Sequence, residues 1–159
     1  MTVVIEPQVP TNSETAVTLK KVLPSGMVFP FDFGYIEGTK DENGHPLCVL
    51  ILSEFASSDA LECRLIGGIQ AFEREGRNRK IRKDRLIAIS NYSRIFSGYQ
   101  GMIDLPAEII TEIESFLVDQ AASEGKIFTV EGRISAVMGM KQVEKATKAN
   151  MQKEATGVN

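Results

Sequence analysis

The sequence contains few residues that bind soft metal ions. Its 159 residues include one histidine, His45, and two cysteines, Cys48 and Cys63. His45 and Cys48 form a His-x-x-Cys pair that could supply two zinc ligands, but a closed zinc site requires four. We therefore expect His45 to be a solvated residue of a turn. We expect Cys48 to be a small apolar side chain of a buried strand.

Signals for secretion and membrane insertion are also missing. Residues 1–7 contain neither a basic segment nor a long apolar core, so we predict no signal peptide. No apolar run approaches the length that crosses a bilayer. These features predict a cytoplasmic protein with two reduced, buried cysteines. A single disulfide between them is the alternative.

The composition is that of an ordinary globular protein, with 43% hydrophobic and 25% charged residues. The net charge of −3 is too small to identify a partner. A chain of this length buries about two thirds of its unfolded surface, so it needs no metal or disulfide for stability. We predict one domain over residues 1–159, with residues 1–15 and 150–159 less ordered.

The first two thirds of the chain has the pattern of β-strands. Residues 27–35 carry Phe29, Phe31, Phe33 and Tyr35 at a spacing of two, which places them on one face of an extended segment. Residues 47–52 form a continuous apolar run, typical of a strand that is buried on both faces. Further strands are predicted at residues 16–23, 61–72 and 81–90.

The remaining third alternates helix, strand and helix. Apolar residues recur at helical spacing over residues 106–123, with Asp104 as the predicted N-cap and Gly125 as the stop. A strand follows at residues 126–133 and a second helix at residues 137–155. The pattern predicts an α+β, mainly β fold: a small closed antiparallel β-barrel, OB-like, with two helices packed outside.

Residues 22–36, which read Val-Leu-Pro-Ser-Gly-Met-Val-Phe-Pro-Phe-Asp-Phe-Gly-Tyr-Ile, resemble the soluble (family I) inorganic pyrophosphatases. The similarity continues in order through residues 44–50, 64–67, 84–89, 104–106 and 130–132. It implies a barrel that hydrolyses pyrophosphate with Mg²⁺ and commonly forms homo-oligomers. In that family carboxylates hold the metal ions, and the metal ions activate water and neutralise the leaving phosphate.

The metal-binding signature of that family has the form Asp-x-Asp-Pro-x-Asp. The corresponding residues 43–48 read Asn-Gly-His-Pro-Leu-Cys, so Asn43, His45 and Cys48 stand at the carboxylate positions. Nitrogen and sulfur ligands suit softer metals than Mg²⁺. We therefore expect that this chain does not bind the Mg²⁺ that the resemblance implies.

Other site positions carried over from the resemblance are changed as well. Asn43, Glu73 and Asp84 are the candidates for remnant metal ligands, and the last hairpin carboxylate of the family falls on Lys83. The phosphate-facing tyrosines correspond to Phe29 and Phe33, which cannot donate from a hydroxyl, and we expect them to pack in the core. A Tyr-Lys pair falls near Asp119 and Gln120.

The hairpin at residues 73–85 is strongly basic. It holds seven basic and three acidic residues, a charge of +4, so the rest of the chain carries −7. We predict an anion site formed by Lys21, Lys83 and Arg85, in which guanidinium and ammonium groups bind phosphate directly. The alternative is a solvated hairpin with no ligand.

Two functions follow from these patterns. The first is a catalytically silent relative that binds phosphate, pyrophosphate or another small phosphorylated ligand. The alternative is a weak or altered diphosphatase that uses Glu73, Asp84 and residues such as Glu37, Asp41 or Glu42 as substitute ligands. Nucleic-acid binding is disfavoured because the net charge is acidic and no aromatic residue lies between the arginines.

Overall fold

The computed structural model describes residues 2–5, 31–53 and 60–155. Its strands are β1 (Thr2–Ile5), β2 (Phe31–Ile36), β3 (Cys48–Leu52), β4 (Ala60–Glu75), β5 (Ile81–Arg82), β6 (Arg85–Ser90) and β7 (Lys126–Ser135). Its helices are the short 3-10 helix η1 (Met102–Asp104), α2 (Ala107–Ser123) and α3 (Ala136–Ala155). The strand predicted at residues 16–23 lies outside the described residues, as do Lys21 and Phe29.

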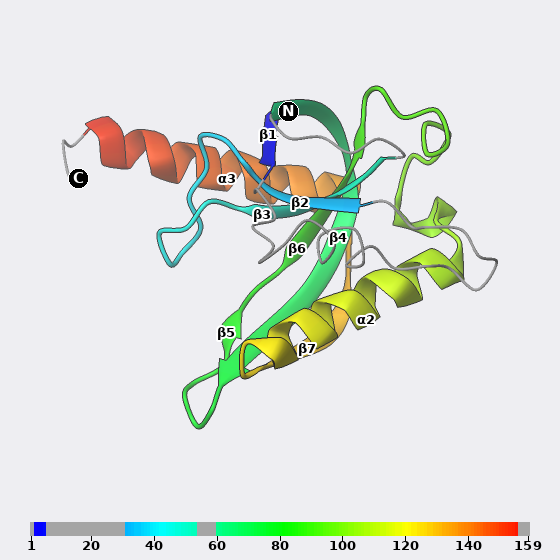
Figure 1. Cartoon of the computed structure of the whole chain (residues 1–159). Helices are drawn as coiled ribbons and strands as arrows, with labels where there is room; N and C mark the ends of the chain where they lie inside the picture. The colour runs from blue at the N-terminus through cyan, green and yellow to red at the C-terminus, as the bar shows by residue number, and fades with distance from the viewer. Residues whose placement is uncertain (1, 6–30, 54–59, 156–159) are drawn as a thin grey trace, which may run out of the picture.

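The strands form the small, mainly β barrel that the sequence predicts (Figure 1). They pair in the order β1-β2-β3-β6-β4, and β1 also pairs with β4, so the pairings close a ring. One detail of the prediction is wrong, because β3 and β6 run parallel, with Val49 beside Leu86 and Leu52 beside Ile89. Parallel neighbours need a long connection, which β4 and β5 provide.

Strand β4 is shared between the ring and an antiparallel extension. Its first part pairs with β1 and β6, and from Gly67 to Glu75 it pairs with β7. The register with β6 shifts between Leu65 and Gly67. Gly67 has φ +145°, and a Cβ there would lie 2.4 Å from the backbone oxygen of Ile134 and 2.4 Å from Cγ of Met102. Glycine is therefore required where the pairing with β7 begins and the register with β6 shifts.

The central strands are buried on both faces; of the run predicted at residues 47–52, residues 49–52 are buried, whereas Leu47 and Cys48 are half-buried. Leu50 and Leu52 pack in one apolar cluster with residues of α2, whereas Val49 and Ile51 pack in a second cluster that includes Val143 of α3. In β6, Ile87 and Ile89 join the first cluster, and Leu86 and Ala88 join the second. Full burial of each such side chain contributes roughly 1.5–3 kcal/mol to folding.

The N-cap of helix α2 lies two residues after the predicted one. It is Pro106, whereas the carboxylate Oδ2 of Asp104 accepts hydrogen bonds from the backbone N–H of Gln100 (2.9 Å) and of Gly101 (3.2 Å). The predicted stop is confirmed, since Gly125 has φ 77° directly after the C-cap Glu124. The apolar face of α2 packs in the core. Among the described residues, no helix is long and apolar enough to cross a membrane.

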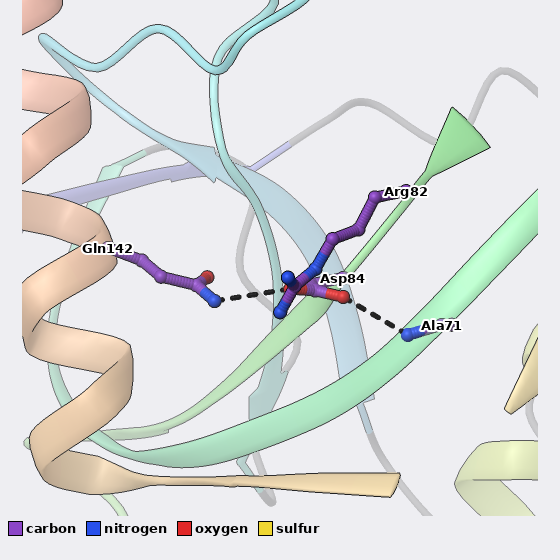
Figure 2. Close-up of polar contacts among 4 residues, drawn as sticks. All are labelled: Ala71, Arg82, Asp84 and Gln142. Carbon is purple, nitrogen blue, oxygen red and sulfur yellow. Dashed lines mark hydrogen bonds and ion pairs between the residues drawn. The ribbon is translucent and has the colours of Figure 1, made fainter. Parts of the chain in front are cut away.

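A buried carboxylate links α3 to the barrel (Figure 2). Oδ1 of Asp84 accepts a hydrogen bond from the backbone N–H of Ala71 at 3.1 Å. Oδ2 accepts from Nε of Arg82 at 2.8 Å and from Nε2 of Gln142 at 3.1 Å. The Asp84 side chain is 11% exposed, so these donors replace water around it. Asp84 therefore joins β4, β5 and α3.

This network predicts the effect of a substitution at Asp84. In Asp84→Asn an amide N–H₂ would face one or two of the three donors, so we expect the free energy of unfolding to fall by about 1–3 kcal/mol. The measurement is equilibrium urea unfolding. Arg82→Ala is the matched control, because the Arg82 side chain is 51% exposed. Its cost should stay below about 1 kcal/mol. Equal stability of Asp84→Asn and the wild type would contradict the structural role of Asp84.

Candidate functional site

A cavity of about 160 Å³ lies between helix α2 and the strands. Its apolar wall consists of Phe33, Gly34, Leu117, Ala121 and Phe128, and its polar wall of Cys48, Glu73, Arg85, Gln120 and Glu124. The ring of Phe33 stacks on that of Phe116 in α2, with 5.1 Å between the centroids. Phe33 is therefore a packing residue, as predicted, and it also lines the cavity.

Arg85 supplies a cation to this cavity. It is the first residue of β6, and it is half-buried. Its guanidinium carbon lies 5.7 Å from the centroid of the Phe128 ring, a distance typical of a cation–π contact. No described residue accepts a hydrogen bond from the Arg85 guanidinium or forms an ion pair with it. Its N–H donors are thus unused by the described part of the chain.

Glu73 supplies the buried carboxylate of the cavity. It lies on β4 opposite Phe128 of β7, and its side chain is 10% exposed. The ammonium Nζ of Lys126 lies 3.7 Å from Oε1 of Glu73 and 3.8 Å from Oε2 of Glu124. The ammonium of Lys126 therefore pairs with both carboxylates. Its ion pair with the buried Glu73 is better shielded from water than its ion pair with Glu124.

The structure brings together three of the site residues that the sequence predicts. Cys48, Glu73 and Arg85 come from β3, β4 and β6 and line the same cavity. Cys48 is half-buried and faces this cavity, so its interpretation as a side chain of the buried core is wrong. The fully buried part of that strand starts one residue later, at Val49.

Two residues of the degenerate signature do not reach the cavity lining. Asn43 and His45 are exposed in the turn before β3. Oδ1 of Asp41 accepts hydrogen bonds from the backbone N–H of Asn43 (2.8 Å) and of His45 (2.9 Å). The turn is thus built around Asp41 by the local side-chain bonding that aspartate favours. His45 is a solvated turn residue, as predicted, whereas Asn43 as a remnant metal ligand stays a prediction.

Both oxygens of Asp84 accept hydrogen bonds from the protein, and Asp84 is not part of the cavity lining; its assignment as a remnant metal ligand stays a prediction. Lys83 is half-buried, and its backbone N–H donates to the carbonyl of Ala71, but it is not part of the cavity lining. The predicted partner Lys21 lies outside the described residues. Of the two predicted anion-binding residues that the structure describes, Lys83 and Arg85, only Arg85 is found in the cavity wall.

The basic hairpin between β4 and β6 is mostly a solvated surface. Exposed side chains include Arg74, Arg77, Arg79, Lys80 and Arg82. The ammonium of Lys80 lies 4.5 Å above the ring centroid of Phe72. Only Glu73 and Arg85, at the two ends of the hairpin, line the cavity. The hairpin's charge of +4 is therefore mostly outside the cavity, which is less positive than the sequence suggests.

Sequence reasoning missed Glu124 and Lys126. They flank Gly125, where α2 ends and β7 begins. The signal that could have found them is their position at this junction of the predicted helix and strand, on either side of the predicted stop Gly125. Using it requires the pairing of β4 with β7, which the sequence does not give.

The two cysteines are free and differ in their surroundings. The alternative of a disulfide between them is therefore wrong. Cys48 faces the cavity, whereas Cys63 lies in the second apolar cluster. Burial raises the pKa of the Cys63 thiol from 9.0 to about 11, with a smaller contribution from the carboxylate of Glu62.

The donor set does not fit Mg²⁺. That ion takes oxygen ligands in octahedral geometry, usually with more than one carboxylate or phosphate. Here the cavity offers the thiol of Cys48, the amide of Gln120 and two carboxylates, Glu73 and Glu124, that already share an ammonium. In the described part of the chain no three His, Cys, Asp or Glu residues are grouped to hold a metal ion.

The closed ring of strands, with α2 covering a cavity that is lined by two carboxylates and one guanidinium, defines a small OB-like barrel with a polar cavity. A family model for inorganic pyrophosphatase matches residues 8–153. The chain therefore belongs to the inorganic pyrophosphatase family.

Similar proteins support this assignment. The inorganic pyrophosphatase of Saccharolobus solfataricus is 29% identical over 144 residues, which cover 87% of this chain and 81% of the relative. That of Leifsonia xyli subsp. xyli is 31% identical over 119 residues, 73% of this chain and 70% of the relative. The structure of the Helicobacter pylori inorganic pyrophosphatase superposes with a TM-score of 0.71 at 22% identity, covering 95% of this chain and 93% of that one. At this identity the structural similarity shows the fold alone.

The environments of the thiols predict their reactivity. At pH 8 iodoacetamide should modify Cys48 in the native protein and leave Cys63 unmodified. The native Cys63 thiol is buried, and at a pKa of about 11 its thiolate fraction at pH 8 is about one in a thousand. Mass spectrometry of native and urea-unfolded protein measures the result, and Cys48→Ser is the control. Equal labelling rates of Cys48 and Cys63 in the native state would refute this assignment.

Proposed function

We propose that this protein binds a small phosphate-bearing anion, such as phosphate or pyrophosphate, and does not hydrolyse pyrophosphate with Mg²⁺. The observation that carries the proposal is the position of Arg85. Its guanidinium lies in the cavity wall against Phe128 and has no carboxylate partner among the described residues. A guanidinium beside a cavity binds phosphate oxygens through charge-assisted hydrogen bonds.

The rest of the cavity supports the absence of hydrolysis. In the inorganic pyrophosphatases that the sequence resembles, bound metal ions supply the activated water and stabilise the leaving phosphate. This cavity has a thiol, Cys48, at a signature position, and its buried carboxylate, Glu73, has an ammonium partner. Neither arrangement attracts a hard divalent cation.

A second candidate function is a weak or altered diphosphatase. Its support is that the relatives from Saccharolobus solfataricus and Leifsonia xyli are inorganic pyrophosphatases. Two carboxylates, Glu73 and Glu124, also lie in the cavity wall. Of the other predicted substitute ligands, Asp84 accepts hydrogen bonds from the protein with both oxygens. Glu37, Asp41 and Glu42 are not part of this lining.

We also propose a cytoplasmic protein of one domain that assembles as a homo-oligomer, as the resemblance implies. The apolar face of α2 packs in the core, so it is not available for an interface with a second copy. Exposed apolar side chains on α3, which include Val137, Met138 and Met140, support this helix as a surface for a second copy.

The proposal predicts very low pyrophosphatase activity. With Mg²⁺ and pyrophosphate, phosphate release should be slower than that of an ordinary enzyme by orders of magnitude, because the site lacks the metal ligands. A phosphate-release assay measures it. Arg85→Ala is the control for contaminating host enzyme, whose rate this substitution leaves unchanged. A rate typical of an ordinary enzyme that falls in Arg85→Ala would favour the second candidate.

Anion binding should stabilise the fold without any divalent metal. In EDTA at low ionic strength, pyrophosphate at about 100 times its dissociation constant should add about 2.7 kcal/mol of stability. The shift in melting temperature measures this, and it should shrink as salt increases because charge-assisted contacts are screened.

The matched variants are Arg85→Gln, in the cavity wall, and Arg79→Gln, in the exposed part of the hairpin. The stabilisation should be lost in the first and kept in the second. No shift in the wild type, or an equal shift in Arg85→Gln, would show that the cavity does not bind the anion.

A further inference from the structure

The ammonium of Lys126 occupies the position between the two carboxylates at the cavity. Its Nζ is 3.7 Å from Oε1 of Glu73 and 3.8 Å from Oε2 of Glu124. The Glu73 side chain is 10% exposed and that of Lys126 is 31% exposed, so water screens this pair only in part. A carboxylate buried to this extent requires a positively charged partner.

The charges around the cavity are balanced by this one side chain. Among the described residues, Glu73, Glu124 and Arg85 line the cavity, and Lys126 contacts both carboxylates from beside it, which gives two negative and two positive charges. Without the ammonium, these residues would carry a net negative charge. An anion at Arg85 would then meet the unpaired carboxylate of Glu73 across the same small cavity.

We propose that Lys126 determines ligand specificity by serving as the built-in cation of this site, so that Arg85 binds a metal-free phosphate anion rather than a metal–phosphate complex. The inference rests on the proposed anion-binding function and goes further, because it names the form of the ligand and the residue that selects it. Lys126 acts through Glu73 and Glu124. It is a positioning residue for charge and takes no part in a chemical step.

The proposal predicts a specific pattern of phosphate affinities in a set of four proteins. These are the wild type, Lys126→Met, Glu73→Gln and the double variant Glu73→Gln/Lys126→Met. Inorganic phosphate is titrated into each by calorimetry in EDTA. Removing the ammonium alone should weaken phosphate binding about tenfold or more, because Glu73 then repels the anion. Removing both charges should restore the affinity to within a few-fold of the wild type.

A second titration uses Mn²⁺ alone, without phosphate. The wild type should give no saturable binding, because the carboxylates already have their cation. Lys126→Met should bind Mn²⁺ at Glu73 and Glu124, and the double variant should lose that binding. Adding Mn²⁺ should also recover phosphate binding in Lys126→Met. Lys141→Met, at an exposed position on α3, is the matched control and should behave as the wild type.

The outcomes separate this inference from the proposed function. Wild-type phosphate binding that is unchanged in Lys126→Met would overturn the role of Lys126 and leave anion binding at Arg85 intact. If the wild type bound no phosphate in EDTA, the anion-binding function would fail, and the Mn²⁺ titration would still decide the role of Lys126. Equal Mn²⁺ binding by the wild type and Lys126→Met would overturn it. Circular dichroism melts establish that each variant is folded, and Lys126→Gln provides a second uncharged replacement.

Discussion

Strand β4 forms backbone hydrogen bonds with four other strands, and both the barrel and the site depend on this pairing. Its first part closes the ring with β1 and β6, and its second part holds β7 and β5. The pairing with β7 begins at Gly67, where Ile134 and Met102 leave no space for a side chain. The same strand carries Glu73 into the cavity and presents the N–H of Ala71 to Asp84. The position of the site is therefore set by the backbone of one strand.

The electrostatics of the cavity follow from which side chains that backbone brings together. A buried carboxylate on β4 faces the start of β7, where Lys126 lies directly after the end of α2. The ammonium of Lys126 neutralises the carboxylate of Glu73, so this carboxylate needs no bound divalent cation to balance its charge. The guanidinium of Arg85, supported by the ring of Phe128, then has no carboxylate partner among the described residues. We propose that this arrangement replaces metal-mediated contact with phosphate by direct contact.

The sequence predicts the elements of this fold better than it predicts their contacts. Continuous burial of residues 49–52 and the helix that ends before Gly125 follow from apolar spacing and from the conformational freedom of glycine. The parallel pairing of β3 with β6 has no local signal, because it depends on how β4 crosses the barrel. Asp104 resembles a helix cap in sequence, but its carboxylate binds the N–H groups of the preceding turn instead.

The candidate site was also predicted only in part, because its residues meet through tertiary contacts that the sequence does not show. Cys48, Glu73 and Arg85 belong to three strands whose order the family resemblance implies, so they could be assigned to one cavity. Asp84 lies next to Arg85 in the chain, but its side chain bonds to Gln142 of α3, which only the tertiary structure shows. Lys126 is separated from Glu73 by most of the C-terminal half of the chain, and their contact depends on the β4–β7 register.

A crystal soaked with both phosphate and Mn²⁺ tests the central claim most directly, because anomalous scattering distinguishes the two ligands at one site. The account predicts phosphate density at the guanidinium of Arg85, the ammonium of Lys126 between Glu73 and Glu124, and no manganese peak at these carboxylates. A manganese peak bound by Glu73, with Lys126 displaced, would contradict it.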